Sequence, residues 1–188
     1  MITNQSKPQN LRMTVYCALF TALIIIGAYI SIPIPIGPVP ITLADFFVML
    51  TGFFLGAKYG FLTVVLYLAL GTIGLPVFSN GGSGFAFLFG PTGGFLFGYL
   101  FLVVGIGLFI DNLKSSFIID LLALLVGNVL LYAVGITWLR VTLDMTWSAA
   151  VLAGLIPFIP GTIVKIIVAL AIGRMFVPRF RENMVRYR

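Results

Sequence analysis

The sequence has no histidine and only one cysteine, Cys17, which stands inside an apolar segment. A single cysteine excludes a disulfide framework within the chain, and the lack of histidine argues against a zinc site and a histidine proton relay. The G-x-x-x-x-G-K-[ST] motif is also missing, so the chain does not hydrolyse ATP through a P-loop of its own. We therefore predict no catalytic residue, no metal site and no cofactor.

Charged residues are scarce as well. They make up 9% of the 188 residues, whereas 61% are hydrophobic and the mean hydropathy is +1.17. Soluble domains are about one-quarter charged, so this composition predicts an integral membrane protein, built as a single domain over residues 1–188. The net charge of +6 is better explained by the orientation of the chain in the membrane than by binding to nucleic acid.

Apolar segments alternate with short polar, glycine-rich or proline-rich ones, which predicts an all-α protein of six transmembrane helices. We expect these helices at residues 13–31, 42–56, 59–74, 93–110, 117–136 and 161–176. The first is too long for the apolar region of a cleaved signal peptide and is expected to be retained. Several others are nearer about 15 residues than the ~20 that cross the hydrocarbon core, which leaves space where loops can form a pocket.

Basic residues divide unequally between the two sides of this bundle. With the N-terminus in the cytoplasm, Arg140 alone is outside, and the cytoplasmic side holds Lys7, Arg12, Lys58, Lys114, Arg174, Arg179, Arg181, Arg186 and Arg188. Cytoplasmic loops collect Lys and Arg, so we predict that both termini are cytoplasmic, in a bacterial-type cell membrane. A Pro-rich loop, residues 32–40, and a Gly-rich loop, residues 74–94, are then external.

The Gly-rich loop is the longest stretch of glycine and polar backbone in the chain, yet apolar segments flank it. Hydrocarbon offers its N–H and C=O groups no partner, so we interpret this loop as the lining of a binding cavity. Asn80, Ser83 and Thr92 supply donors and acceptors, and glycines such as Gly82 let the backbone approach a ligand. The apolar walls of such a site would come from Phe78, Phe85, Phe87 and Phe89.

Lys165 is the one basic residue that this topology places inside a membrane helix. It shares a face of about 80° of arc with Thr162, Ala169 and Gly173, opposite the branched aliphatic residues. An ionisable residue on such a small, polar face is a candidate for ligand binding, and an anionic or strongly hydrogen-bonding ligand is expected. Snorkelling to the interface and a structural pair with Asp45 are the alternatives.

Three further features have both a structural and a functional interpretation. Thr42 and Asp45 match an acidic capping box, although Asp45 also suits contact with a ligand or a lysine. Asn128 is expected to hydrogen-bond between helices rather than to a ligand. Ala18 and Ala22 form a small-xxx-small pair, which favours internal packing or the docking of a partner helix.

Taken together, these segments resemble the BioY family, the biotin-specific substrate-binding subunits (S components) of energy-coupling factor (ECF) transporters. The resemblance rests on GPVPITL (37–43), GFFLGAKYGFLTVVLYLALGTIGLPVF (52–78), GGSG (81–84), GPTGGFLFGY (90–99) and PFIPGTIVK (157–165). It covers most of the chain, and the ordered set of motifs is specific.

The resemblance implies a six-helix S-component fold that binds biotin near its external side, beneath the Pro-rich and Gly-rich loops. It also implies a transmembrane coupling protein, docked at Ala18 and Ala22, and two cytoplasmic ATPases. Two positions depart from the family pattern. Thr162 stands where members commonly have an acidic residue, and Ser83 stands where many have a basic one. These departures leave Lys165 as the main electrostatic contact to biotin.

We therefore expect the chain to capture external biotin without changing it chemically. The valerate chain would lie against phenylalanines, and the carboxylate or the ureido oxygen would meet Lys165. Asn80 and Thr162 would complete the hydrogen bonds of the ureido group. The alternatives are an S component for another vitamin and a membrane binding protein outside this transporter class.

Overall fold

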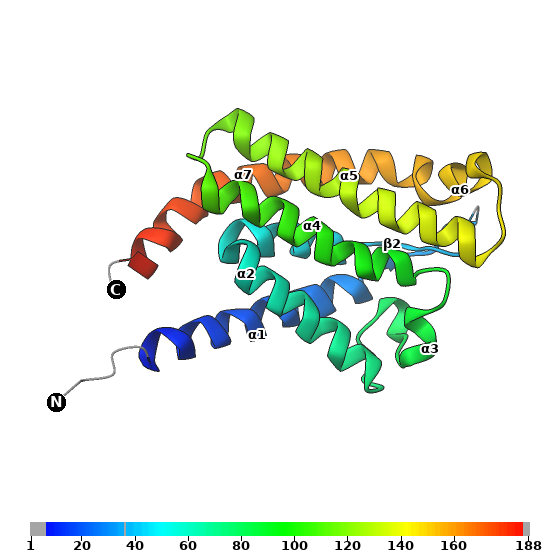
Figure 1. The fold of residues 1–188 in the computed structure, drawn as a ribbon, viewed down its shortest axis with the longest axis horizontal. Coiled ribbons are helices and arrows are strands. Elements are labelled where there is room, and N and C mark those ends of the chain that lie inside the picture. Colours follow the sequence, from blue (N-terminus) through cyan, green and yellow to red (C-terminus); the bar gives the residue numbers. More distant parts are fainter. Residues whose placement is uncertain (1–6, 36, 186–188) are drawn as a thin grey trace.

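The computed structural model describes residues 7–35 and 37–185, which are mostly helical (Figure 1). The long helices are α1 (Lys7–Tyr29), α2 (Ala44–Thr72), α4 (Gly93–Asn112), α5 (Phe117–Thr142) and α7 (Ile159–Val185). Shorter elements are β1 (Ser31–Ile32), β2 (Ile41–Thr42), α3 (Phe85–Leu88), α6 (Trp147–Gly154) and the 3₁₀ turns η1 (Ser79–Gly81) and η2 (Ile156–Phe158). β1 and β2 pair antiparallel as a small hairpin around the Pro-rich loop.

Within these described residues, five helical segments are long and apolar enough to cross a membrane. This finding agrees with the predicted all-α membrane protein. The six predicted helices fall on five segments because the predictions at 42–56 and 59–74 both lie in α2.

α2 is broken at Gly56, which has φ 70° and ψ −172°. A residue with a Cβ rarely adopts that conformation, so glycine permits the break. Before it, α2 runs antiparallel to α1. The Leu43 N–H donates to the Gly27 carbonyl (3.0 Å), whereas Phe54, further along α2, packs on Phe20, earlier in α1.

After the break, α2 runs parallel to α1. The Thr21 hydroxyl donates to the Thr63 carbonyl (3.2 Å). Further along both segments, the Tyr29 hydroxyl donates to the carbonyl of Pro76, just beyond the end of α2. The two halves of α2 therefore form a helical hairpin, which is visible in Figure 1 as the cyan and teal segments below α4.

α4 is the central helix and packs against α2 and α5. Small residues let these helices approach closely: Gly105 faces Gly127 of α5, and Gly107 faces Ala57 of α2. Such contacts are typical of membrane bundles, where apolar burial does not drive helix association. At the end of α4, the Asp111 carboxylate accepts a hydrogen bond from the Ala57 N–H (2.8 Å), which satisfies a donor freed by the break in α2.

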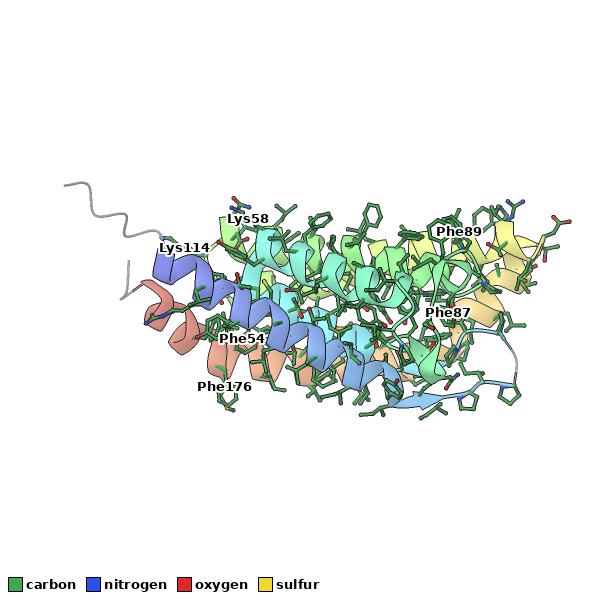
Figure 2. All side chains as sticks on the ribbon, turned by 90° about the horizontal axis from the view of Figure 1, so that it is seen from below. Phe54, Lys58, Phe87, Phe89, Lys114 and Phe176 are labelled. Atoms are coloured by element: carbon green, nitrogen blue, oxygen red, sulfur yellow. The ribbon has the colours of Figure 1, made fainter. Side chains whose placement is uncertain are left out.

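The two ends of the bundle differ in structure and in charge. The start of α1 and the end of α7 lie at one end, and the hairpin, α3 and α6 lie at the other (Figure 1). Lys58 and Lys114 lie at the first end (Figure 2), whereas Arg140 closes α5 at the end that carries α6. This arrangement agrees with the predicted grouping of basic residues, of which Arg186 and Arg188 lie outside the described residues.

Two local predictions were wrong. The segment after residue 148 was not expected to be helical, but α6 forms there because the Thr146 side chain accepts from the Ala149 N–H (3.3 Å), a standard N-cap. The capping box at the start of α2 is not formed either. The N-cap position is Leu43, which makes no side-chain cap, and the Asp45 carboxylate binds another partner.

Candidate functional site

Two adjoining cavities lie near the loop end of the bundle, with about 320 and 330 Å³ of open space. We call the first the inner compartment. Its own lining residues are Asp45, Leu131, Tyr132, Phe158 and Lys165. We call the second the loop compartment, and its own lining residues are Ala28, Ala44, Tyr67, Ser79, Phe87, Thr92 and Leu96. The shared wall, common to both, consists of Val39, Pro40, Thr42, Phe95 and Tyr99.

An ion pair between Lys165 and Asp45 forms the polar centre of the inner compartment. The Lys165 ammonium lies 2.8 and 2.9 Å from the two oxygens of the Asp45 carboxylate and 2.6 Å from the Thr42 carbonyl oxygen. Lys165 and Asp45 are 8% and 7% exposed. Because each charge neutralises the other, the pair places polar groups in the cavity wall without net charge.

Three elements bring these groups together. Lys165 lies six residues into α7, Asp45 is in the first turn of α2, and Thr42 ends β2. Lys165 shares the buried face of α7 with Ala169, whereas Ile167 on the opposite face is 61% exposed. The helical spacing therefore predicts the inward direction of Lys165 correctly. Of the alternatives that the sequence leaves open for this side chain, the structure shows the pair with Asp45 and not snorkelling.

Aromatic side chains enclose the ion pair. Phe95 and Phe158 stack with ring centroids 6.1 Å apart, and the Tyr132 ring meets Phe158 edge-on at 6.3 Å. The Tyr132 hydroxyl is hydrogen-bonded to the Thr162 hydroxyl (2.6 Å). Thr162 is thus tied to a lining residue, although it is not itself part of the lining.

The Gly-rich loop covers the loop compartment. Phe87 lines this compartment and stacks on Phe78, with centroids 5.2 Å apart, and Phe78 is fully buried. Gly82 packs so closely on the Phe87 ring that a side chain at this position would collide with it. Thr92, next to the start of α4, also lines the compartment. The predicted role of this loop as cavity lining is therefore consistent with the position of Thr92 and Phe87.

Other predicted site residues lie away from both cavities. Asn80 is exposed with φ 56°, Ser83 is half-buried, and Phe85 is 65% exposed and packs on Phe89 at 4.8 Å. Asn128 is buried and donates to the Leu124 carbonyl (2.8 Å), within its own helix. Its interhelical contact is a longer one, 3.7 Å to the sulfur of Met49.

Sequence reasoning missed the tyrosines of the site. Tyr67, Tyr99 and Tyr132 all line the cavities from within long apolar helices. A phenol in such a helix needs a polar partner or a cavity for its hydroxyl, and that requirement is the signal that could have identified these residues. Phe95 and Phe158 gave no comparable signal, since phenylalanine is common throughout the chain.

The sequence is similar to known membrane transport proteins along most of its length. The model of the BioY family matches residues 3–182. The biotin transporter BioY of Thermotoga maritima is 42% identical over 163 residues, which are 87% of this chain and 94% of that protein. A biotin transporter BioY of Lactococcus lactis is 37% identical over 179 residues, with 92% and 93% of the two chains covered.

A solved structure has the same fold. It is the crystal structure of the S-component for biotin from an ECF-type ABC transporter, with a TM-score of 0.84 and 35% sequence identity. The match covers 97% of this chain and 95% of the other. The family model, the relatives and the fold agree along nearly the whole length, and so this chain is a member of the BioY family.

Proposed function

We propose that this chain captures biotin from the external side of the membrane, as the substrate-binding subunit of an ECF-type vitamin uptake transporter. The observation that carries this proposal is the buried ion pair of Lys165 and Asp45 inside an aromatic cavity, which adjoins the compartment lined by the Gly-rich loop. The named functions of the relatives, biotin transporters and a biotin S-component, support the same conclusion. The role is binding and transport, and no chemical step on biotin is involved.

Biotin suits the two compartments. Its fused ring carries a ureido group, with two N–H donors and a carbonyl acceptor, and its valerate chain ends in a carboxylate. An uncharged group that both donates and accepts matches a lysine–aspartate pair better than a carboxylate does, because Asp45 already neutralises Lys165. We therefore assign the ureido group to the inner compartment, with Thr162 acting through Tyr132, and the valerate chain to the loop compartment.

The Gly-rich loop completes the proposed site. Thr92 and Gly82 lie at the loop compartment, one in its lining and one behind Phe87. Asn80, Ser83 and Phe85 belong to the outer part of the same loop, and we assign them to the cover that closes over the ligand.

The proposed setting is a bacterial-type cell membrane crossed six times, with each half of α2 counted as one crossing and with both termini in the cytoplasm. Lys58 and Lys114 lie at the end that holds the start of α1 and the end of α7, which supports this orientation. Ala18 and Ala22 are exposed on α1, and we assign them to the docking of a transmembrane coupling protein, which would work with two cytoplasmic ATPases.

Thermal stabilisation of the purified protein tests the proposed ligand. A ligand that binds only the folded state at 1,000 times its Kd adds about 4 kcal/mol to the free energy of unfolding. We expect biotin to raise the melting temperature by several degrees, and riboflavin, thiamine and folate to leave it unchanged. Stabilisation by one of those vitamins instead of biotin would assign the chain to a different substrate.

A further inference from the structure

A side-chain hydrogen bond connects α1 to the Gly-rich loop. Tyr29, the last residue of α1, donates its hydroxyl to the carbonyl of Pro76. Pro76 precedes the turn η1, which also packs against α1. Ser79 of η1 and Ala28 of α1 both line the loop compartment. The position of the loop over the site is thus fixed in part from α1.

The other attachments of the loop are to α5, where the Trp138 Nε1–H donates to the Gly90 carbonyl (3.0 Å), and to α2. Phe78 is buried against Gly71, near the end of α2, and the Gly84 N–H donates to the Gly71 carbonyl (2.7 Å). Both anchors converge on one turn of α2. The hydrogen bond from the Tyr29 hydroxyl is therefore a separate attachment of the loop, on a different helix. The Tyr29 side chain is also accessible, since the residue is 54% exposed.

Tyr29 also shares a face with the proposed docking residues. Seven residues separate it from Ala22 and eleven from Ala18, so all three lie within about 40° of arc on α1. All three are exposed. A helix packed along Ala18 and Ala22 and continued by two turns would reach the Tyr29 ring.

We infer that Tyr29 is a positioning residue that holds the Gly-rich loop over the bound ligand, and that a coupling-protein helix docked along Ala18 and Ala22 displaces its hydroxyl from Pro76. Docking on the outside of α1 and opening of the site are then one event. This inference rests on the proposed function, since it concerns the release of the ligand captured there.

The dissociation rate of radiolabelled biotin from the purified subunit tests the first part. Tyr29→Phe removes only the hydroxyl, and losing one hydrogen bond of about 0.5–1.5 kcal/mol should speed dissociation about 2- to 12-fold. The melting temperature of the ligand-free protein should fall by no more than the loss of one such hydrogen bond allows, so the variant stays folded. Tyr16→Phe, a matched change on the same helix but far from the loop, should dissociate at the wild-type rate.

Equal rates of biotin dissociation from Tyr29→Phe and from wild type would overturn the inference. So would a Tyr16→Phe variant that releases biotin as fast as Tyr29→Phe does. A wild-type protein that retains no biotin would instead overturn the proposed function. Membranes that also contain the coupling protein test the second part. There, docking should speed release from wild type more than from Tyr29→Phe, because the variant has already lost the attachment. If the coupling protein speeds biotin release from wild type and from Tyr29→Phe by the same factor, docking does not act through Tyr29.

Discussion

At the scale of single residues, the buried ion pair of Lys165 and Asp45 bears on stability and is the centre of the site that we propose for biotin. The ammonium and the carboxylate are each more than nine-tenths buried and are 2.8 Å apart. Removing one partner leaves the other charge buried without compensation, which typically costs 3–5 kcal/mol, whereas removing both is often neutral. The two roles of the pair can therefore be separated by mutation.

We expect Lys165→Met to lower the free energy of unfolding by about 3 kcal/mol and to weaken biotin binding at least about 100-fold, since Asp45 loses its partner and the ligand loses a donor. The double variant Asp45→Asn with Lys165→Met should recover most of the stability but not the affinity. Denaturant unfolding in detergent and calorimetric titration with biotin measure the two quantities. Wild-type affinity in the double variant would contradict the assigned site.

The sequence predicts one member of this pair well and its partner poorly. The direction of Lys165 follows from helical periodicity, because small residues share its face. Its partner Asp45 is 120 residues away, and the local pattern around it also fits a capping box, so no local rule selects between the two. Asn80 is a different case: its position in a glycine-rich loop suggests contact with a ligand, but only tertiary packing decides that its side chain is exposed in this structure.

At the scale of elements, the break in α2 determines how the β1–β2 hairpin and the Gly-rich loop are placed against the helical core. Gly56 has positive φ, and a Cβ there would run into the Asp111 carboxylate, which holds the Ala57 N–H. The first half of α2, from Ala44 to the break, is about 20 Å long at 1.5 Å per residue. The break therefore places Asp45 at the depth of Lys165.

Substituting Gly56→Ala should lower the free energy of unfolding by about 2 kcal/mol or more, because backbone strain and the clash with Asp111 add together. Gly74→Ala is the matched control. Gly74 also has positive φ (106°), but a Cβ there would meet nothing within 4 Å. Unfolding in detergent should show a clearly smaller loss for the control, and equal losses would rule out the clash as a cause.

On α1, Ala22→Leu should abolish at least about nine-tenths of biotin uptake into cells and leave biotin binding to the purified subunit unchanged. The added bulk keeps a partner helix from the close approach that small residues allow. Ala171→Leu makes the same change at an exposed alanine of α7 and should transport normally. Uptake of labelled biotin and binding to purified protein provide the comparison, and normal uptake by Ala22→Leu would remove Ala22 from the docking face.

At the scale of the whole molecule, Lys58 and Lys114 lie at one end of the bundle and the candidate site lies near the other. Lys58 and Lys114 lie at the end opposite the labelled Phe87 and Phe89 of the loop region (Figure 2). Most of this polarity was predictable, because charge distribution and apolar length are properties of the chain taken segment by segment. The enclosure of the site was not, since Tyr67, Tyr99 and Tyr132 meet only after three helices have packed.

Cysteine labelling in a Cys17→Ala background tests the orientation. We expect Ser148→Cys, in the exposed part of α6, to react with a membrane-impermeant maleimide in intact cells. Lys58→Cys should react only after the cells are permeabilised. The reverse labelling pattern would show that the chain has the opposite orientation in the membrane, with the candidate site on the cytoplasmic side.

The shared wall between the two compartments would limit the length of a ligand that occupies both. Val39, Pro40, Thr42, Phe95 and Tyr99 are fixed to the hairpin and to α4, so the spacing from the ion pair to the loop compartment is set by the fold. A molecule that fills both compartments gains the advantage of two linked binding events, whereas a fragment that fills one does not. The two compartments would therefore select for ligand length. A homologue of biotin one methylene shorter or longer would keep its contacts in one compartment only by losing those in the other.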